Sequence, residues 1–182
     1  MADPAGATGH TRHFLALRPD EAAAARLAAL CQPGEGRCVH PADLHLTLAF
    51  LGDLRAPSVE ALMARLDLVC RPGPLAVVLD RIEAWRGPRA LCALGDVPQV
   101  ADLVDALWRE LAAFGHVRDT RPFRPHVTLA RKLPAAVCRR PPQALVPPVC
   151  WTATELWLLA SRPEAGGPGQ ARYVVQAVRS LL

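Results

Sequence analysis

Two short stretches of this chain carry the same polar residues in an apolar surrounding. Residues 41–50 read PADLHLTLAF and residues 122–131 read PFRPHVTLAR, so both have proline, histidine, threonine, leucine and alanine at matching places. With six histidines and seven threonines in the chain, composition alone supplies roughly 0.2 His-x-Thr triplets. The longer pattern occurs twice, in strand-like settings, and therefore indicates a site built from two parts.

The residues of this repeated pattern suit displacement at phosphorus without a metal ion. Side chains alternate between the two faces of a strand, so His45 shares a face with Thr47, and His126 shares one with Thr128. One imidazole can take a proton from the attacking oxygen while the other protonates the leaving oxygen, because imidazole titrates near neutrality. The two hydroxyls can donate hydrogen bonds to non-bridging phosphate oxygens.

Other chemistries have weaker support in the sequence. A zinc site on Cys31, Cys38 and His40 would have the spacing C-x6-C-x-H, which matches none of the usual zinc patterns. There is no nucleophile elbow, and no glycine-rich phosphate loop follows a strand. A single histidine in an apolar strand is more often structural than catalytic, and only the duplication reverses this for the motif histidines. The remaining histidines are expected to be structural or exposed: His10, His13, His40 and His116.

Apolar periodicity and turn residues predict the elements that must position the two motifs. Helices are expected after Pro19-Asp20-Glu21 and along two apolar faces of helical spacing. The residues of these faces are Val59, Leu62, Met63, Leu66 and Val69, and then Val100, Leu103, Val104, Leu107, Leu111 and Phe114, with Gly115 ending the second. Strands are expected at residues 13–17, around each motif, and at 75–85, 89–95, 151–161 and 171–178.

Turn residues and element order then predict the architecture. The strands at 75–85 and 89–95 form a hairpin around Gly87-Pro88, residues 141–148 form a proline-rich connection, and residues 164–170 form a loop. Helices and neighbouring strand pairs interleave, so the expected fold class is α+β with antiparallel sheet. The repeated motif fits two related halves that face one another.

Composition sets the size and the charge of this fold. The chain has 182 residues and about half of them are apolar, which predicts one compact domain over residues 12–182 after a mobile tail at 1–11. The net charge is only +4, but residues 118–140 hold seven basic residues against Asp119 alone. This segment encloses the second motif and favours a polyanion as partner, with a solvated basic loop as the alternative.

Cysteine usage and hydropathy indicate where the protein works. The six cysteines have no CxxC pair and no compact framework spacing, so they are expected to be reduced thiols, mostly in the core. No signal peptide is evident at residues 1–12, and no apolar run reaches the roughly 18 residues of a membrane helix. We expect a soluble, cytoplasmic monomer with no membrane contact.

At the two decapeptides the sequence resembles the 2H phosphoesterase superfamily, which is named for two H-x-[TS] motifs. More narrowly, it is similar to the RNA 2′,3′-cyclic phosphodiesterases, also called 2′-5′ RNA ligases. The likeness includes RHFLAL at residues 12–17, DLHLTLAFLG at 43–52 and PFRPHVTLAR at 122–131. It continues to the end of the chain, where it depends on the LWLLAS strand and the Tyr173 strand.

This resemblance implies two pseudo-symmetric lobes, each an antiparallel sheet backed by helices, with a central cleft that receives one motif from each lobe. It implies hydrolysis of 2′,3′-cyclic phosphate on RNA ends or nucleotides to a 2′-phosphomonoester, with no metal or cofactor. His126 would be the base that activates water and His45 the acid that protonates the 3′-oxygen. The reverse reaction would be 2′-5′ ligation.

The residues around the central four are expected to contribute to substrate binding. Arg131 matches the basic residue that closes the family's second motif, although strict alternation places it on the far face from His126, where it reaches the cleft only if the strand twists or ends. Phe50 holds the equivalent place in the first motif and either packs in the core or lines a base pocket. Arg124, with the neighbouring Phe123, could hold an RNA backbone and stack a base, or belong to a basic loop with a buried ring.

Two further functions stay open from the sequence. One is a basic RNA-binding module whose site has lost activity, which would bind RNA in a salt-dependent way without turnover. The other is a 2H phosphoesterase that acts on a different cyclic or 2′-5′-linked nucleotide. Substrate and base preference depend on loops that the sequence does not place.

Overall fold

The computed structural model describes residues 11–54, 56–69, 72–161 and 171–182. Its elements confirm the α+β class. In chain order they are β1 (His13–Leu17), α1 (Glu21–Ala29), β2 (Arg37–Cys38), η1 (Pro41–Asp43), β3 (Leu46–Gly52), α2 (Ala56–Val69), β4 (Leu75–Trp85), β5 (Ala90–Leu94), α3 (Pro98–Ala113), β6 (His126–Arg131), η2 (Val137–Arg139), β7 (Gln143–Ala153), β8 (Glu155–Ser161) and β9 (Tyr173–Ser180).

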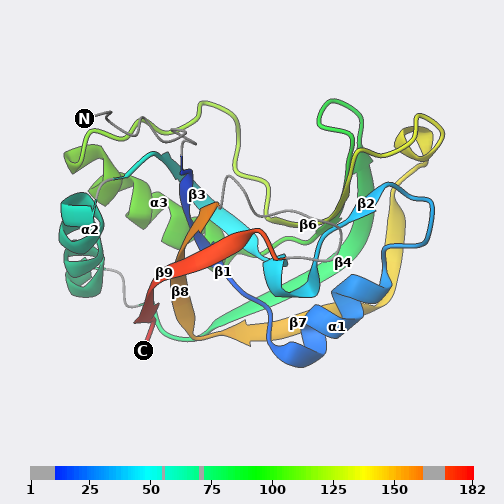
Figure 1. Cartoon of the computed structure of the whole chain (residues 1–182). Coiled ribbons are helices and arrows are strands. Elements are labelled where there is room, and N and C mark those ends of the chain that lie inside the picture. Colours follow the sequence, from blue (N-terminus) through cyan, green and yellow to red (C-terminus); the bar gives the residue numbers. More distant parts are fainter. Residues whose placement is uncertain (1–10, 55, 70–71, 162–170) are drawn as a thin grey trace, which may run out of the picture.

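The described strands form one sheet with the two motif strands at its centre. Its order is β7-β4-β5-β6-β3-β1-β8-β9, with β2 added on β6, and every described pairing is antiparallel. β3 and β6 share one described pair, Leu46 with Val127. The sheet therefore consists of two halves of four strands, joined where the two motifs meet (Figure 1). We call these halves the first lobe, with β3, and the second lobe, with β6.

The helices cover one face of this sheet. Asp20 caps α1 by accepting a hydrogen bond from the Ala23 amide at 2.8 Å, as the sequence favours for an Asp at this place. Leu62, Met63 and Leu66 of the predicted α2 face are buried in one core cluster with residues of both lobes, and Val59 packs against it. The side chain of Val69 lies outside the described residues. The predicted face of α3 belongs to the same cluster. Phe114 is the exception, since it is 38% exposed at the end of α3. Residues of all three helices belong to the main core, with α2 and α3 toward one end of the molecule and α1 toward the other (Figure 1).

The other face of the sheet carries two smaller apolar clusters, one in each lobe. Phe14 and Ala16 of β1 pack with Leu159, while their neighbours in β1 belong to the main core. Ala90 and Cys92 of β5 form the corresponding cluster in the second lobe. Because neighbouring residues of a strand point to opposite faces, these clusters lie on the side of the sheet opposite the main core.

Two predicted features of the last third of the chain are wrong. The proline-rich connection is instead the first part of β7, which pairs with β4 and loses register between Leu79 and Arg81. Proline cannot donate to a ladder, so the register breaks where Pro147 and Pro148 occur. The strand expected at 151–161 is divided at Thr154 into the end of β7 and β8. The loop expected at 164–170 and the tail at 1–10 lie outside the described residues.

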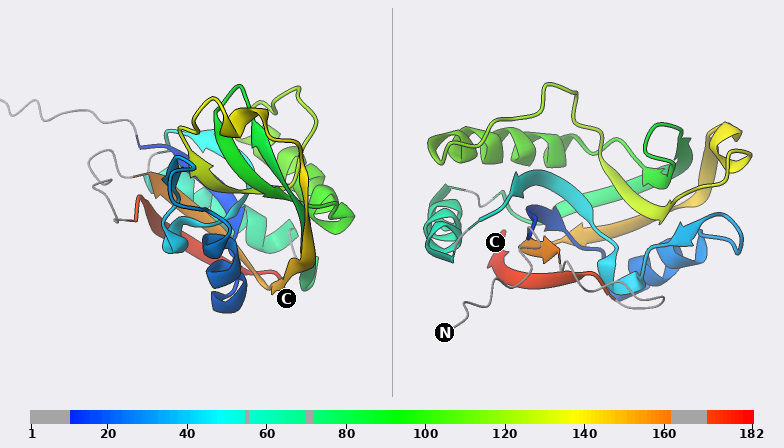
Figure 2. Two further views of the ribbon diagram at one scale, coloured as in Figure 1. Left: turned by 90° about the vertical axis from the view of Figure 1, so that its right-hand side faces the viewer. Right: turned by 45° about the horizontal axis from the view of Figure 1, so that its top comes forward.

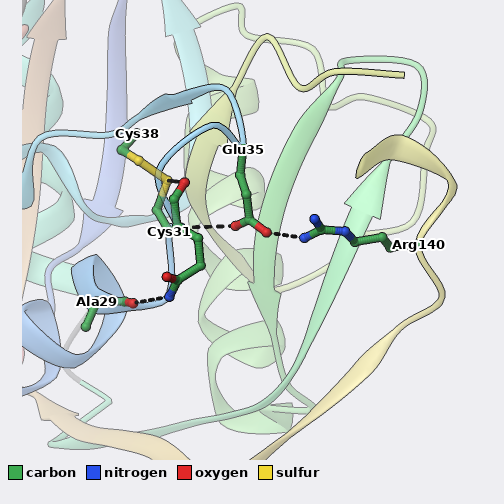
Figure 3. The surroundings of a disulfide bond; sticks show 6 residues. Ala29, Cys31, Glu35, Cys38 and Arg140 are labelled. Carbon is green, nitrogen blue, oxygen red and sulfur yellow. Dashed lines mark hydrogen bonds and ion pairs between the residues drawn. A yellow bond between two sulfur atoms is a disulfide. The ribbon is translucent and has the colours of Figure 1, made fainter. Parts of the chain in front are cut away.

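The cysteines are not all reduced. Cys31 and Cys38 form a disulfide that closes the loop between α1 and β2 (Figure 3). Neither thiol is then free to bind zinc as the alternative site would require. Cys92 and Cys138 are buried as expected, Cys150 is exposed, and Cys70 lies outside the described residues. The pairing was not predicted because sequence spacing alone does not show which thiols approach one another.

Among the described residues no helix is long and apolar enough to span a bilayer.

His13 is a buried structural histidine, as expected. Its ring accepts a hydrogen bond from the Leu54 amide at 3.2 Å and lies 3.3 Å from the Gly52 carbonyl oxygen.

Candidate active site

A pocket of about 140 Å³ opens where the two lobes meet. Residues of both motifs line it together with aromatic and small side chains from neighbouring strands. The lining residues are Phe14, His45, Thr47, Phe50, Trp85, Pro88, Ala90, Cys92, His126, Thr128, Arg131 and Tyr173. The four central residues predicted from the sequence are thus brought to one small space.

His45 lies just before β3 and is held on three sides. Its Nδ1 is 2.6 Å from the carbonyl oxygen of Asp43. Its ring centroid is 4.8 Å from that of Phe14 and 5.2 Å from that of Tyr173, which meets it edge-on at 88°. These contacts leave the ring one orientation, with Nε2 as the nitrogen available to a ligand.

His126 repeats this arrangement in the second lobe. Its Nδ1 is 2.7 Å from the carbonyl oxygen of Arg124, again two residues before the histidine. Trp85 packs on the ring with a centroid distance of 4.5 Å. A carbonyl oxygen can only accept, so in both histidines Nδ1 carries the proton and neutral Nε2 has a lone pair.

Burial disfavours the charged form of both imidazoles. It lowers the pKa of His45 from 6.5 to about 4, opposed by the bond to the Asp43 carbonyl and reinforced by the charge of Arg131. Burial also lowers the pKa of His126, again with Arg131 as a contributor. The unliganded site therefore holds two neutral imidazoles and one guanidinium at neutral pH.

Two β-bulges bring Phe50 and Arg131 to the pocket, and the strict alternation expected from the sequence is wrong here. In β3, Ala49 pairs with Leu15 and Thr47 with Ala16, which leaves Leu48 as an extra residue. Leu48 and Ala49 are consecutive and both buried. The extra residue reverses the alternation, so Phe50 returns to the side of Thr47.

The second motif has the same irregularity at the equivalent residue. In β6, Ala130 pairs with Leu91 and Thr128 with Cys92, so Leu129 is extra. Leu129 and Ala130 are both buried, and Arg131 lines the pocket. The strand does not need to end or to twist away for this guanidinium to reach the cleft.

Arg124 and Phe123 are not among the described residues that line the pocket. The Arg124 guanidinium binds Glu83 at 2.8 Å and lies 4.9 Å above the Trp85 ring. Trp85 Nε1 donates to the same carboxylate at 3.2 Å. Arg124 therefore contacts the wall behind His126, while Phe123 packs against the main core.

Sequence reasoning missed several residues that shape the pocket. Asp43 is buried, and its carboxylate accepts hydrogen bonds from the Arg172 and Tyr173 amides at 2.7 and 3.2 Å. It thereby fixes the start of β9 and places Tyr173 beside His45. The sequence shows an aspartate two residues before a motif histidine, but only the structure shows that it is buried. The contribution of Trp85 from β4 has no signal in the sequence.

Cys92 faces Thr128 across the β5–β6 ladder. Burial raises the pKa of its thiol to about 12, while a hydrogen bond with Thr128 opposes this. The group is a protonated thiol at neutral pH, so it is a neighbour of the Thr128 hydroxyl and no nucleophile.

Comparison with known proteins places the chain in one family. The 2′-5′ RNA ligase superfamily matches residues 8–164. The RNA 2′,3′-cyclic phosphodiesterase of Escherichia coli is 35% identical over 60% of this chain and 63% of its own length, and the protein of that name from Geobacillus stearothermophilus is 32% identical over 52% and 32%. The chain thus matches less than two thirds of the length of either relative.

Solved structures match over nearly the whole chain. The crystal structure of Escherichia coli LigT complexed with 3′-AMP has a TM-score of 0.78 and 28% identity, covering 94% of this chain and 98% of that one. The structure of TT0787 from Thermus thermophilus has a TM-score of 0.73 and 28% identity, covering 93% and 97%. With its doubled motif, its two-lobed sheet and these matches, the chain belongs to the 2′-5′ RNA ligase superfamily.

Proposed function

We propose that the protein is an RNA 2′,3′-cyclic phosphodiesterase that forms 2′-phosphomonoesters without a metal ion. One observation carries this proposal: two imidazoles, each with Nδ1 bound to a carbonyl, line one pocket together with two threonines and a guanidinium. The names of the curated relatives support the same reaction.

The reaction follows from these groups. His126 Nε2 takes a proton from water as the water oxygen bonds to phosphorus. The bond from phosphorus to the 3′-oxygen breaks, and His45 gives its proton to that oxygen. Thr47, Thr128 and Arg131 donate hydrogen bonds to the non-bridging oxygens, whose charge grows in the transition state. With a 5′-hydroxyl in place of water as the attacking group, the same groups in the same roles would perform 2′-5′ ligation.

His45 has to gain a proton before it can act as the acid, because its pKa in the unliganded site is about 4. A bound phosphate anion supplies the reason: it favours the imidazolium, and the attraction is strongest where water is excluded. We therefore expect a bell-shaped dependence of rate on pH, with the optimum of kcat at higher pH than that of kcat/KM.

The active unit we propose is a single chain, with residues 12–182 as one domain. This chain supplies both motif histidines to one pocket, and one apolar core joins the helices to strands of both lobes.

The deciding experiment is incubation with the four 2′,3′-cyclic mononucleotides in excess EDTA. We expect turnover to survive the chelator and the product to be the 2′-phosphate isomer. A binding module without activity gives no product with any of the four. Turnover that EDTA abolishes and added metal restores, or a 3′-phosphate product, contradicts the proposed mechanism.

A further inference from the structure

Six exposed cations gather at the end of the second lobe that adjoins the pocket. They are Arg37, Arg86, Arg89, Lys132, Arg139 and Arg140, and we call this surface the basic end. It comprises β2, the turn between β4 and β5, and the segment from β6 to η2. These three pieces lie together at the right of Figure 1 and face the viewer at the left of Figure 2.

Hydrogen bonds hold these pieces against one another. Arg89 Nε donates to the Leu133 carbonyl at 2.8 Å, and Arg86 Nε donates to the Cys138 carbonyl at 3.3 Å. Carbonyl oxygens are neutral, so these bonds order the guanidinium groups without cancelling their charge. Within the described residues, the one carboxylate that pairs with the basic end is Glu35, bound to Arg140 (Figure 3).

The rest of the basic segment 118–140 is different. Arg118 pairs with Asp105, Arg121 with Asp119, and Arg124 with Glu83. The charge excess seen in the sequence is thus largely compensated before β6. Among the described residues of this segment, those without a carboxylate partner are Arg131 at the pocket and Lys132 and Arg139 at the basic end.

The junction between pocket and basic end is a pair of arginines. Arg37 lies directly opposite Arg131 in the β2–β6 ladder, and opposite residues of such a pair share one face of the sheet. Gly36 makes this approach possible: its φ is +109°, and a Cβ there would lie 2.6 Å from the Arg131 carbonyl oxygen. Like charges placed directly opposite destabilise a sheet, so this arrangement favours an anion bound between them.

We propose that the basic end binds the backbone phosphates on the 5′ side of the cyclic phosphate, which makes an RNA end the preferred substrate over a free nucleotide. This proposal rests on the proposed function. A 2′,3′-cyclic phosphate closes the 3′ end of a strand, so all other phosphates lie on its 5′ side. The rim at Phe50 and Tyr173 is aromatic, whereas the rim at Arg131 continues into the six cations.

The test measures binding of a 5′-fluorescein single-stranded RNA of about ten nucleotides that ends in a 2′-phosphate. Its anisotropy is titrated with wild type, with Arg37→Gln/Arg139→Gln and with the control Arg65→Gln/Arg109→Gln over a range of salt. The control cations are exposed on α2 and α3, which lie toward the opposite side of Figure 1.

The double substitution at the basic end should weaken RNA binding about tenfold at low salt. It should also reduce the slope of log affinity against log salt by about 1.4, because each phosphate that is no longer neutralised contributes about 0.7. The control pair should change the affinity less than twofold. Equal losses in both pairs, or an unchanged salt slope, overturn the proposal. If circular dichroism shows that the double variant does not fold, the single variant Arg139→Gln in η2 is tested instead. It should reduce the slope of log affinity against log salt by half as much, about 0.7.

Turnover gives a second readout. The ratio of kcat/KM for the RNA bearing a 2′,3′-cyclic phosphate to that for a cyclic mononucleotide should fall about tenfold in the variant of the basic end; an unchanged ratio contradicts the proposal. If wild type hydrolyses neither substrate, the proposed function fails, while the anisotropy data still decide whether the basic end binds RNA.

Discussion

The two motif strands, β3 and β6, are built alike as far as their bulges. In each, a histidine bonds a carbonyl two residues earlier, a threonine follows, and an extra leucine forms a bulge. The next residue that returns to the pocket is Phe50 in β3 and Arg131 in β6. The shared part provides groups for acid–base chemistry, and the unlike residues make one wall aromatic and the other cationic.

The difference extends to the neighbouring strands. Thr47 faces Ala16 across its ladder, whereas Thr128 faces Cys92. His45 packs against Phe14 and Tyr173, whereas His126 packs on Trp85, whose ring also contacts the Arg124 guanidinium. The two lobes thus repeat one arrangement but give the pocket two unlike walls. This asymmetry suits the proposed nucleotide substrate, which has a base on one side and phosphate on the other.

The largest effect is expected from removing either imidazole. His45→Ala and His126→Ala should each lower kcat by about 10³-fold or more on a 2′,3′-cyclic nucleotide, and the double variant should lose little beyond that, because the two groups act as one unit. Single-turnover rates measure this. His116→Ala is the matched control, and wild-type rates in either motif variant contradict the paired mechanism.

The threonines come next and test whether the two walls hold the phosphate equally. Thr47→Val and Thr128→Val should each lower kcat by about 10²-fold, because each removes one hydrogen-bond donor to the transition state. Thr47→Ser and Thr128→Ser keep the hydroxyl and should retain most of the activity. A Val variant as active as its Ser counterpart would show that the hydroxyl at that position does not contribute.

Phe50 and Arg131 should separate base binding from phosphate binding. Phe50→Ala should weaken a nucleotide inhibitor about tenfold, since stacking is worth about 1–3 kcal/mol per base, and leave inhibition by inorganic phosphate unchanged. Arg131→Gln should weaken both inhibitors, because a charge-assisted bond to phosphate is lost. The measurement is the inhibition constant of the nucleotide and of inorganic phosphate in each variant. If both variants change the two constants in the same way, the two walls do not bind different parts of the ligand.

The last prediction concerns stability instead of activity. The unfolded chain protonates His45 near pH 6.5, but the folded chain does so only near pH 4. The unfolded state therefore binds the extra proton in this window, and the free energy of unfolding falls as pH drops through it, on the order of 2 kcal/mol from this residue. Urea unfolding at about pH 7 and about pH 4.5 should show a smaller loss in His45→Gln than in wild type. Equal losses would show that burial of His45 does not depress its pKa.

Local patterns predicted most of the elements and the centre of the site. The helix faces on α2 and α3 and the hairpin of β4 and β5 follow from spacing that one segment carries by itself. The proline-rich segment was misassigned because its structure depends on a distant segment: it pairs with β4 and loses register there. The disulfide joins cysteines only seven residues apart, and it was missed because spacing does not show which thiols approach one another.

The sequence alone determined the residue types of the site. They are two histidines and two threonines in a repeat whose apolar alternation predicts strands. Only the tertiary structure decided which further groups meet them. The bulges at Leu48 and Leu129 reverse the alternation, and strands distant in sequence supply Phe14, Trp85 and Tyr173. The physical reason is that a strand's period is local, while its register and its neighbours are set by the pairing of the whole sheet.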